Sequence, residues 1–381
     1  MSSRKKALVT SSYPAPYRVG VFQELAKVYD LDVFFDTSAN ENRNENWFCK
    51  SGDLYFEVLN NETSWKHFKE KLKDIKQYDF IIAYDYTRRP SRYAILKARI
   101  HGIPYFINCD GSIPHKGIWR NLLKRIVYPF IFKGATGCFA SGESAVKNYL
   151  KYGAREDRIF IHHFTSLTEQ DILLKPYSKE EKCLAKEELG LPQKPLVLSI
   201  GQFIRRKGFD ILLEAWKSID CDAALLLIGG GDERLMYEDM IQDLNLKNVM
   251  IRDFMPKNEI FRYYKAADIF VLPTREDIWG LVINEAMAQG LPVITTDNCV
   301  AGVELIKNDV NGYVVKSGSV EELSYRLNKI LQEPKTMTSM IPNNINSMDG
   351  WTMKNVAQSH IEVIDDYFKM KKCKWQGKIT Y

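Results

Sequence analysis

The segment that decides the fold is Leu272-Pro-Thr-Arg-Glu-Asp-Ile-Trp-Gly-Leu-Val-Ile-Asn-Glu-Ala-Met-Ala-Gln-Gly-Leu-Pro292. A buried strand is predicted to end at Leu272, and a helix to begin near Gly280 after a loop. Gly290, with Pro292 just beyond it, predicts where this helix stops. The first N–H groups of such a helix, from Gly280 to Val282, have no intrahelical partner, so together with the helix dipole they predict an anion site. Gly280 would let a ligand approach the backbone closely.

Two carboxylates flank this helix start. Glu285 follows Leu281 and Val282 by about one turn and is therefore expected on the same side of the helix. Asp277 lies in the loop before the helix. A carboxylate repels phosphate but accepts hydrogen bonds from sugar hydroxyls, so the pair predicts a site for a phosphorylated sugar. The alternative is that Glu285 is a solvated helix residue and Asp277 a turn former.

A second informative segment is Ser199-Ile-Gly-Gln-Phe-Ile-Arg-Arg-Lys-Gly-Phe-Asp210, which predicts a strand, a glycine loop and a helix. Arg205, Arg206 and Lys207 form a compact cationic group at the carboxyl end of that strand, where open α/β sheets bind ligands. A diphosphate would be held well by such a group through charge-assisted hydrogen bonds. The alternative is an ordinary solvated turn.

Short apolar runs alternate with amphipathic segments along the whole chain of 381 residues. This alternation predicts βαβ units and an α/β fold of two Rossmann-like domains with parallel sheets facing a central cleft. We expect one domain at 1–180, a second at 190–345 and a helix with a basic tail at 349–381, with a polar linker near 175–192 and a polar break at 343–349. The final helix, 351–369, either continues the second domain or crosses back onto the first. The predicted strands are Ala7–Thr10, Leu31–Phe35, Phe80–Ala83, Tyr105–Asn108, Gly137–Ala140, Ile159–His162, Leu196–Ile200, Ala224–Ile228, Val249–Arg252, Ile269–Leu272 and Val293–Thr295.

Composition excludes several classes of protein. Seven scattered cysteines without a C-x-x-C pair argue against a disulfide framework or a zinc site. No run is long and apolar enough to span a bilayer, and the first residues lack the apolar core of a signal peptide. A net charge of +5 is mild, and nucleic acid is not needed to explain it. We therefore expect a cytoplasmic protein.

The two segments, in this order, resemble glycosyltransferase family 4, the retaining enzymes of the GT-B fold. The pattern of that family matches Gly201 to Gly208 and Asp277 to Val293. Two segments between them, Ile228 to Asp232 and Phe254 to Asp268, also fit. In the first half, Tyr13 to Gly20 is similar to the first glycine loop of the family, and Ile103 to Gly111 to a segment that lines the cleft. In detail, the sequence of these motifs most resembles that of family members that build capsules and exopolysaccharides.

The resemblance implies roles for individual residues. Lys207 would hold the donor diphosphate and Glu285 the ribose, with backbone at Leu281 and Val282 near the phosphate or ribose. Backbone near Met255 would meet the base, and Gly20 would allow the first-domain loop to approach the diphosphate. The catalytic set implied is Asp277, Lys207 and Glu285, with donor contacts from Gly20, Gln202, Arg205, Arg206, Met255, Gly280, Leu281 and Val282.

The sequence departs from the family pattern at three places. Asp277 stands where the family has its first glutamate, so either Asp277 or Glu276 would reach the sugar. Gln202 replaces an arginine, and Arg205 or Arg206 would supply the charge. Cys109 replaces a first-domain histidine beside Asp110; Asp110 and His115 remain weak candidates on the acceptor side.

The implied reaction moves a sugar from a nucleotide-sugar donor to a glycan or polyprenyl-linked acceptor, with no metal and no cofactor. The leaving diphosphate would take the proton of the acceptor hydroxyl on the same face. Two alternatives remain: a nucleotide-sugar epimerase of the same fold, and a non-catalytic membrane-docked scaffold with a degenerate donor site. Asp220-Cys-Asp222 has the spacing of a metal-binding motif, but its position before a strand favours a turn.

Residues 115–133 contain five Lys and Arg residues, no acidic residue and an apolar helical face that includes Val127 and Phe130. Such a segment fits an anionic membrane surface, which would place the protein peripherally on the inner face of the cell membrane. The alternative is an ordinary buried face with solvated lysines. Pro129 is expected to end or kink this helix.

Overall fold

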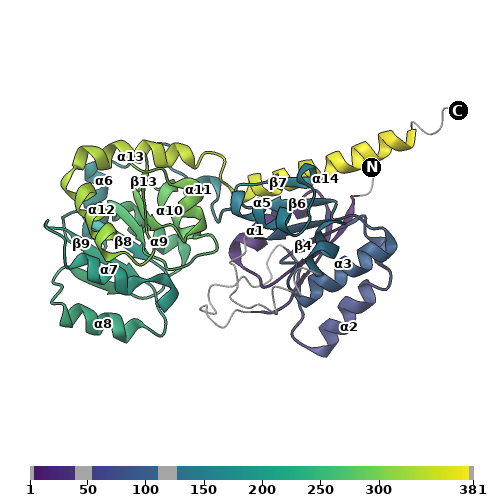
Figure 1. The fold of residues 1–381 in the computed structure, drawn as a ribbon, viewed down its shortest axis with the longest axis horizontal. Coiled ribbons are helices and arrows are strands. Elements are labelled where there is room, and N and C mark those ends of the chain that lie inside the picture. The colour runs from purple at the N-terminus through teal and green to yellow at the C-terminus, as the bar shows by residue number, and fades with distance from the viewer. Residues whose placement is uncertain (1–3, 39–53, 110–126, 377–381) are drawn as a thin grey trace. The chain divides into compact units, whose positions relative to one another are not determined.

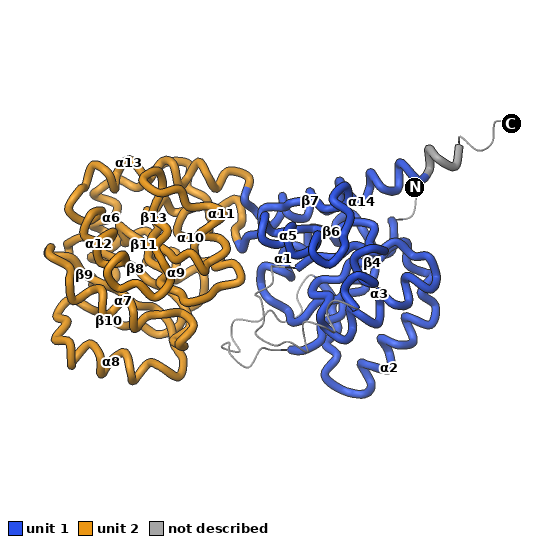
Figure 2. The backbone as a smooth tube through the Cα atoms, viewed as in Figure 1, with its two compact units in different colours: residues 1–166, 351–381 blue, residues 167–350 orange. Residues whose placement is uncertain are grey.

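The computed structural model describes residues 4–38, 54–109 and 127–376, and the side chains only as far as Lys371. The chain divides into two compact units (Figure 2). The first comprises residues 1–166 together with 351–381, and the second comprises residues 167–350.

The first unit contains a parallel sheet in the order β3-β2-β1-β4-β5-β6-β7. The residues of β1 alternate between two hydrophobic clusters, with Ala7 and Val9 in one and Leu8 in the other, because successive side chains of a strand point to opposite faces. Both faces are therefore buried, as is usual in parallel sheets. The strands are β1 (Lys6–Ser11), β2 (Asp30–Phe35), β3 (Glu57–Val58), β4 (Phe80–Tyr84), β5 (Tyr105–Cys109), β6 (Gly137–Ala140) and β7 (Ile159–Ile161).

Helices cover both faces of this sheet (Figure 1). One cluster joins β1 to Phe22 of α1 and to Val356 and Ile364 of α14, so the final helix packs on the first unit. The other cluster takes Phe68 from α2, Ile95 from α3 and further residues from α5. The helices are α1 (Pro16–Ala26), α2 (Glu62–Lys71), α3 (Arg89–His101), α5 (Glu143–Lys151) and α14 (Met353–Gln376).

The second unit contains a parallel sheet in the order β10-β9-β8-β11-β12-β13. Its first strand, β8, lies between β9 and β11: Val197 pairs with Leu225 on one side and Ile269 on the other. The strand order therefore reverses between β8 and β11, which is the point where open α/β sheets bind ligands. The strands are β8 (Leu196–Ile200), β9 (Ala224–Ile228), β10 (Val249–Arg252), β11 (Ile269–Leu272), β12 (Val293–Thr296) and β13 (Gly312–Val315).

Eight helices of the described chain belong to the second unit, on both faces of its sheet (Figure 1). A core cluster joins Leu212 of α7 and Leu327 of α12 to Val197 and Leu225 of the sheet. The helices are α6 (Lys179–Glu188), α7 (Phe209–Trp216), α8 (Arg234–Asp243), α9 (Lys257–Ala266), α10 (Leu281–Ala288), α11 (Val300–Leu305), α12 (Val320–Gln332) and α13 (Pro334–Ser347).

The prediction of an α/β fold with parallel sheets is confirmed. Five predicted strands have the observed bounds, and the other six differ by one residue at one or both ends. Two short edge strands, β3 and β13, were not predicted.

Three local predictions were wrong. The expected linker contains α6, whose Lys182 and Lys186 lie 3.0 and 2.8 Å from the carboxylate of Asp268, so its charge pattern reflects buried ion pairs. The expected polar break is mostly helical, because the side chain of Asn344 donates to the carbonyl of Asn311 and so packs inside. The expected first glycine loop is mostly α1, where Gly20 faces α14.

Candidate functional site

The two segments singled out in the sequence meet at the point where the strand order of the second sheet reverses. A 3-10 turn, η5 (Arg205–Lys207), follows β8, and residues 273–280 follow β11. The backbone N–H of Arg275 donates to the carbonyl of Arg206 at 2.8 Å, and the Thr274 hydroxyl donates to the same carbonyl at 2.9 Å. The cationic turn is therefore held against the loop that leads into α10.

Glycines allow these loops to touch backbone to backbone. Gly208 has φ +71°, and a Cβ there would lie 2.2 Å from the carbonyl oxygen of Pro273. A Cβ on Gly229, after β9, would lie 1.9 Å from the carbonyl oxygen of Gly201. No larger residue fits either position without moving backbone, so three neighbouring strands present tightly packed loops at one edge.

Lys207 and Asp277 form an ion pair in this site, and each side chain is only 12% exposed. Arg206 Nη1 lies 3.7 Å from the other carboxylate oxygen of Asp277 and donates to the carbonyl of Glu276 at 2.7 Å. Burial raises the pKa of Asp277, but the Lys207 and Arg206 charges outweigh it, and the net pKa is lowered. Asp277 is therefore an ionised partner of the cations.

The helix start lies where it was predicted. Gly280 is the N-cap of α10 with φ +98°, and a Cβ there would lie 2.8 Å from Sγ of Cys299. Leu281 and Val282, both half-buried, are its first residues. Helix α10 ends at Ala288, two residues before Gly290, which is left-handed at φ +75°.

Glu285 is held by a tyrosine. The hydroxyl of Tyr264, on α9, donates to Oε2 of Glu285 at 3.1 Å and lies 3.4 Å from the carbonyl oxygen of Val282. Burial, and secondarily the Glu285 charge, raise the pKa of Tyr264, so its hydroxyl remains a donor. Glu285 is half-buried, and this hydrogen bond orients its carboxylate.

The remaining predicted residues are dispersed. Gln202 is half-buried in the loop after β8, and Met255 is half-buried between β10 and α9. Gly20 belongs to the first unit, where a Cβ would lie 2.6 Å from Sδ of Met353; its small size serves the contact between α1 and α14. Asp110 and His115 lie outside the described residues, as does most of 115–133.

Sequence reasoning missed several residues that support the site. Arg275 donates two hydrogen bonds to Asp210, at 2.8 and 2.6 Å, and so ties the loop after β11 to α7. The indole of Trp279 donates to Asn284 at 2.8 Å within the start of α10. Tyr264 lies in the segment that fits the family pattern, but no role was assigned to it, because a tyrosine on an amphipathic helix is most often a core residue.

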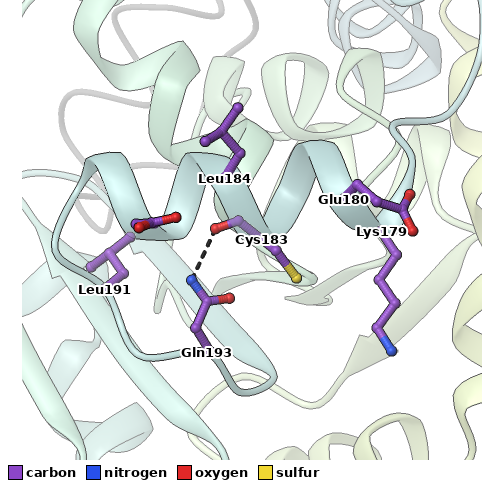
Figure 3. Close-up of a pocket in the computed structure, with 7 residues that line it drawn as sticks. Lys179, Glu180, Cys183, Leu184, Leu191 and Gln193 are labelled. Atoms are coloured by element: carbon purple, nitrogen blue, oxygen red, sulfur yellow. Dashed lines mark hydrogen bonds between the residues drawn. The ribbon is translucent and has the colours of Figure 1, made fainter.

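Two other features lie away from this edge. A hollow along α6 is lined by none of the predicted site residues (Figure 3). Asp222, of the D-x-D spacing, pairs with Lys194 at 2.6 Å where β8 and β9 begin, at the opposite edge of the sheet. Neither feature belongs to the site.

Residues 182–347 match the family model described as Glycosyl transferases group 1. This match covers most of the second unit, residues 167–350. An uncharacterized glycosyltransferase of Haemophilus influenzae is 30% identical over 162 residues, which is 41% of this chain and 45% of that protein. The N,N'-diacetylbacillosaminyl-diphospho-undecaprenol alpha-1,3-N-acetylgalactosaminyltransferase of Campylobacter jejuni is 23% identical, covering 80% of this chain and 82% of that one. The chain thus spans less than half the length of one relative and most of the other.

Several solved structures share the fold of this chain. HepE of Anabaena, in complex with UDP, has a TM-score of 0.76 at 16% identity and covers 95% of this chain and 100% of its own. Sucrose-phosphate synthase of Thermosynechococcus elongatus has a TM-score of 0.73 at 19% identity, over 96% and 100%. The fold is therefore GT-B. Within the described residues, no helix is long and apolar enough to cross a membrane.

Proposed function

We propose that the protein is a retaining glycosyltransferase of family 4 that moves a sugar from a nucleotide-sugar donor to a glycan or polyprenyl-linked acceptor. The observation that carries this proposal is the cationic turn Arg205–Lys207, which is held against the loop into α10 beside a helix N-terminus, at the reversal point of the sheet. A nucleoside diphosphate needs this combination of a lysine, an arginine and free N–H groups.

Each group at this edge has a proposed part in donor binding. Lys207 and the N–H groups of Leu281 and Val282 bind the diphosphate. Glu285, oriented by Tyr264, accepts hydrogen bonds from the ribose hydroxyls. The backbone near Met255 contacts the base.

The chemistry then rests on stabilising negative charge. The bond between the anomeric carbon and the diphosphate oxygen breaks, and the acceptor oxygen attacks that carbon from the same face. The acceptor proton passes to the departing diphosphate, whose growing charge Lys207 and the start of α10 stabilise. Positioned cations and N–H groups supply this stabilisation without reorganising during the reaction.

The names of relatives support an acceptor in surface-polysaccharide biosynthesis. The Campylobacter jejuni relative is named for an undecaprenol-linked acceptor. Others are named for teichuronic acid biosynthesis in Bacillus subtilis and amylovoran biosynthesis in Erwinia amylovora, at 26% and 23% identity. We propose an acceptor of this class, assembled into capsule or exopolysaccharide.

Donor use is tested by incubating the purified protein with UDP-, GDP-, dTDP- and ADP-sugars and lipid-linked acceptors, and following nucleoside diphosphate and product glycan. We expect transfer from one donor with retention of anomeric configuration. Lys207→Met and Glu285→Gln should each lower kcat/KM by about 100-fold or more. The first removes the cation that stabilises the growing charge of the diphosphate, and the second removes the carboxylate that binds the ribose of the donor. Lys194→Met removes the same functional group from an ion pair at the opposite edge and should leave transfer unchanged. No transfer from any donor, or full activity of both site variants, would contradict the proposal.

We also propose that the first unit docks onto an anionic membrane surface. Between Tyr86 and Cys109 the chain has five Lys and Arg residues and no Asp or Glu. On α3 within this stretch, Leu96 and Ile100 are 42% and 66% exposed although they lie four residues apart on one face. An exposed aliphatic stripe with basic neighbours fits the headgroup region of a bilayer, where each basic residue contributes about 1 kcal/mol.

The described end of the basic stretch 115–133 extends this face. Its backbone is helical at 127–132, so Pro129 does not end the helix there. Phe130 is 46% exposed, and the Arg99 guanidinium of α3 lies 3.9 Å from the centre of its ring. Val127 is also exposed, so the expected buried-face alternative does not hold for these two residues.

Vesicle flotation tests this surface. The protein should float with vesicles that contain phosphatidylglycerol and remain free with pure phosphatidylcholine. The double change Leu96→Gln and Ile100→Gln should reduce the bound fraction severalfold. Leu235→Gln, at an exposed leucine on α8 in the second unit, is the matched control and should bind like the wild type. Equal binding by all three proteins would rule out α3 as the docking face.

A further inference from the structure

We propose that Asp277 is a built-in competitor of the donor: its carboxylate occupies Lys207 in the empty site and opposes the arriving diphosphate. This inference rests on the proposed function, because it concerns the same cations that would hold the diphosphate. It assigns Asp277 a role other than contact with the sugar.

The contacts of the carboxylate support this role. One oxygen contacts Nζ of Lys207, and the other lies 3.7 Å from Nη1 of Arg206. The backbone N–H of Trp279 donates to the same carboxylate. With both oxygens engaged and the side chain 12% exposed, Asp277 is arranged as a counter-ion.

The backbone fixes the carboxylate in this position. The N–H of Asp277 donates to the carbonyl of Asn298 at 3.0 Å, and its carbonyl accepts from the N–H of Val300 at 3.2 Å. These two bonds form a parallel bridge between Asp277 and Cys299. The main chain that carries the carboxylate is therefore held beside Lys207.

A fixed negative charge at an anion site has two consequences. In the empty site it pairs with the ammonium of Lys207 and holds its direction, because a cation so little exposed is costly without a partner. In the filled site it repels the diphosphate, so the diphosphate binds less tightly than the cations alone would allow. The product nucleoside diphosphate consequently leaves more readily.

The test is the affinity for UDP and GDP, measured by titration calorimetry on the full chain without donor sugar. Asp277→Asn keeps the size of the side chain and removes its charge. We expect the nucleotide that binds the wild type to bind this variant about tenfold tighter, since one nearby charge alters such an equilibrium by about one power of ten or more. Product inhibition by the same nucleotide should strengthen in the same ratio.

The direction in which the affinity for the nucleoside diphosphate changes distinguishes the possible roles of Asp277. Loss of a sugar contact would leave the affinity for a nucleoside diphosphate unchanged, and loss of a purely structural residue would weaken it. Asp277→Ser provides a second neutral variant should the asparagine variant fold poorly. Asp222→Asn removes the carboxylate of the Lys194 pair at the other edge and should bind like the wild type.

Three outcomes are decisive. Tighter binding by the neutral variants supports the inference. If the wild type binds the nucleotide and both neutral variants bind it equally or more weakly, the inference is overturned and the proposed donor site is retained. Absence of binding by the wild type and all variants overturns both.

Discussion

The first unit is expected to lose stability as the pH falls below about 6.5, because two histidines are buried there without charge. His162 and His360 are 3% and 0% exposed. The side-chain nitrogen of Asn108 lies 3.0 Å from Nε2 of His162 and 3.4 Å from Nε2 of His360. The hydroxyl of Tyr84 lies 3.0 Å from Nδ1 of His360, so this cluster joins α14 to the sheet.

Burial lowers the pKa of both histidines, and the Arg18 guanidinium acts in the same direction. The pKa of His162 falls to about 3, and that of His360 falls well below 6.5. Since the folded pKa values are depressed, the unfolded chain takes up protons first as the pH falls. The stability is therefore complete above about pH 6.5 and declines below it, by about 1.4 kcal/mol per histidine for each pH unit. Between about pH 7.5 and about pH 5.5 the two histidines should together remove about 3 kcal/mol.

Pulse labelling of cysteine measures this loss for each unit separately. After equilibration in urea at either pH, a brief thiol-labelling pulse at one common pH reports unfolding of the first unit through Cys138 and of the second through Cys299. Both thiols are buried, at 1% and 0% exposure. The midpoint for Cys138 should shift with pH by the stated free energy, and the double variant His162→Gln with His360→Gln should lose most of that shift.

The exposed histidine His67, on α2, provides the control, and His67→Gln should keep the full pH dependence. The reasoning is refuted if the double variant retains the wild-type shift, or if the Cys138 midpoint does not respond to pH.

Two further changes test the loops and the orientation of the site. Gly208→Ala should lower the free energy of unfolding of the second unit by about 2–4 kcal/mol in urea and weaken the binding of nucleoside diphosphates, because its Cβ would meet the carbonyl oxygen of Pro273 at 2.2 Å. The control is Gly190→Ala, at a residue with a similar positive φ. Nothing lies within 4 Å of its Cβ, so this change should cost only about 1 kcal/mol in the same measurement. Tyr264→Phe removes the hydrogen bond to Glu285 and should raise the KM for the donor by about tenfold in steady-state assays. An unchanged KM would argue against the orientation of Glu285 by this hydroxyl.

The site was only partly predictable from its residues. The segments around Lys207 and Gly280 were identified because a strand, a glycine loop and a helix start follow one another directly in the sequence. The ion pair between Lys207 and Asp277 was not foreseen, because which cation a carboxylate meets depends on how two loops far apart in the sequence pack. The same holds for Tyr264, whose hydroxyl reaches Glu285 only across two helices.

Two of the errors in the fold prediction have a common physical origin. The lysines and glutamates of α6 suggested a solvated linker, yet the buried Lys186 and the half-buried Lys182 both pair with Asp268. The asparagines at the end of α13 suggested a break, yet the Asn344 amide is satisfied by a backbone carbonyl inside the unit. Polar residues therefore gave misleading signals wherever the folded unit supplied them with a partner.

The sequence by itself determined the alternation of strands and helices, and hence the two parallel sheets, because apolar runs that are buried on both faces are a local property of the chain. It also determined the positions of the cationic turn and of the α10 start. Only the tertiary structure decided that α14 packs on the first unit, that Gly20 serves that contact, and that Asp277 faces Lys207. Each of these depends on contacts between residues distant in the sequence, which local patterns of polarity and spacing do not encode.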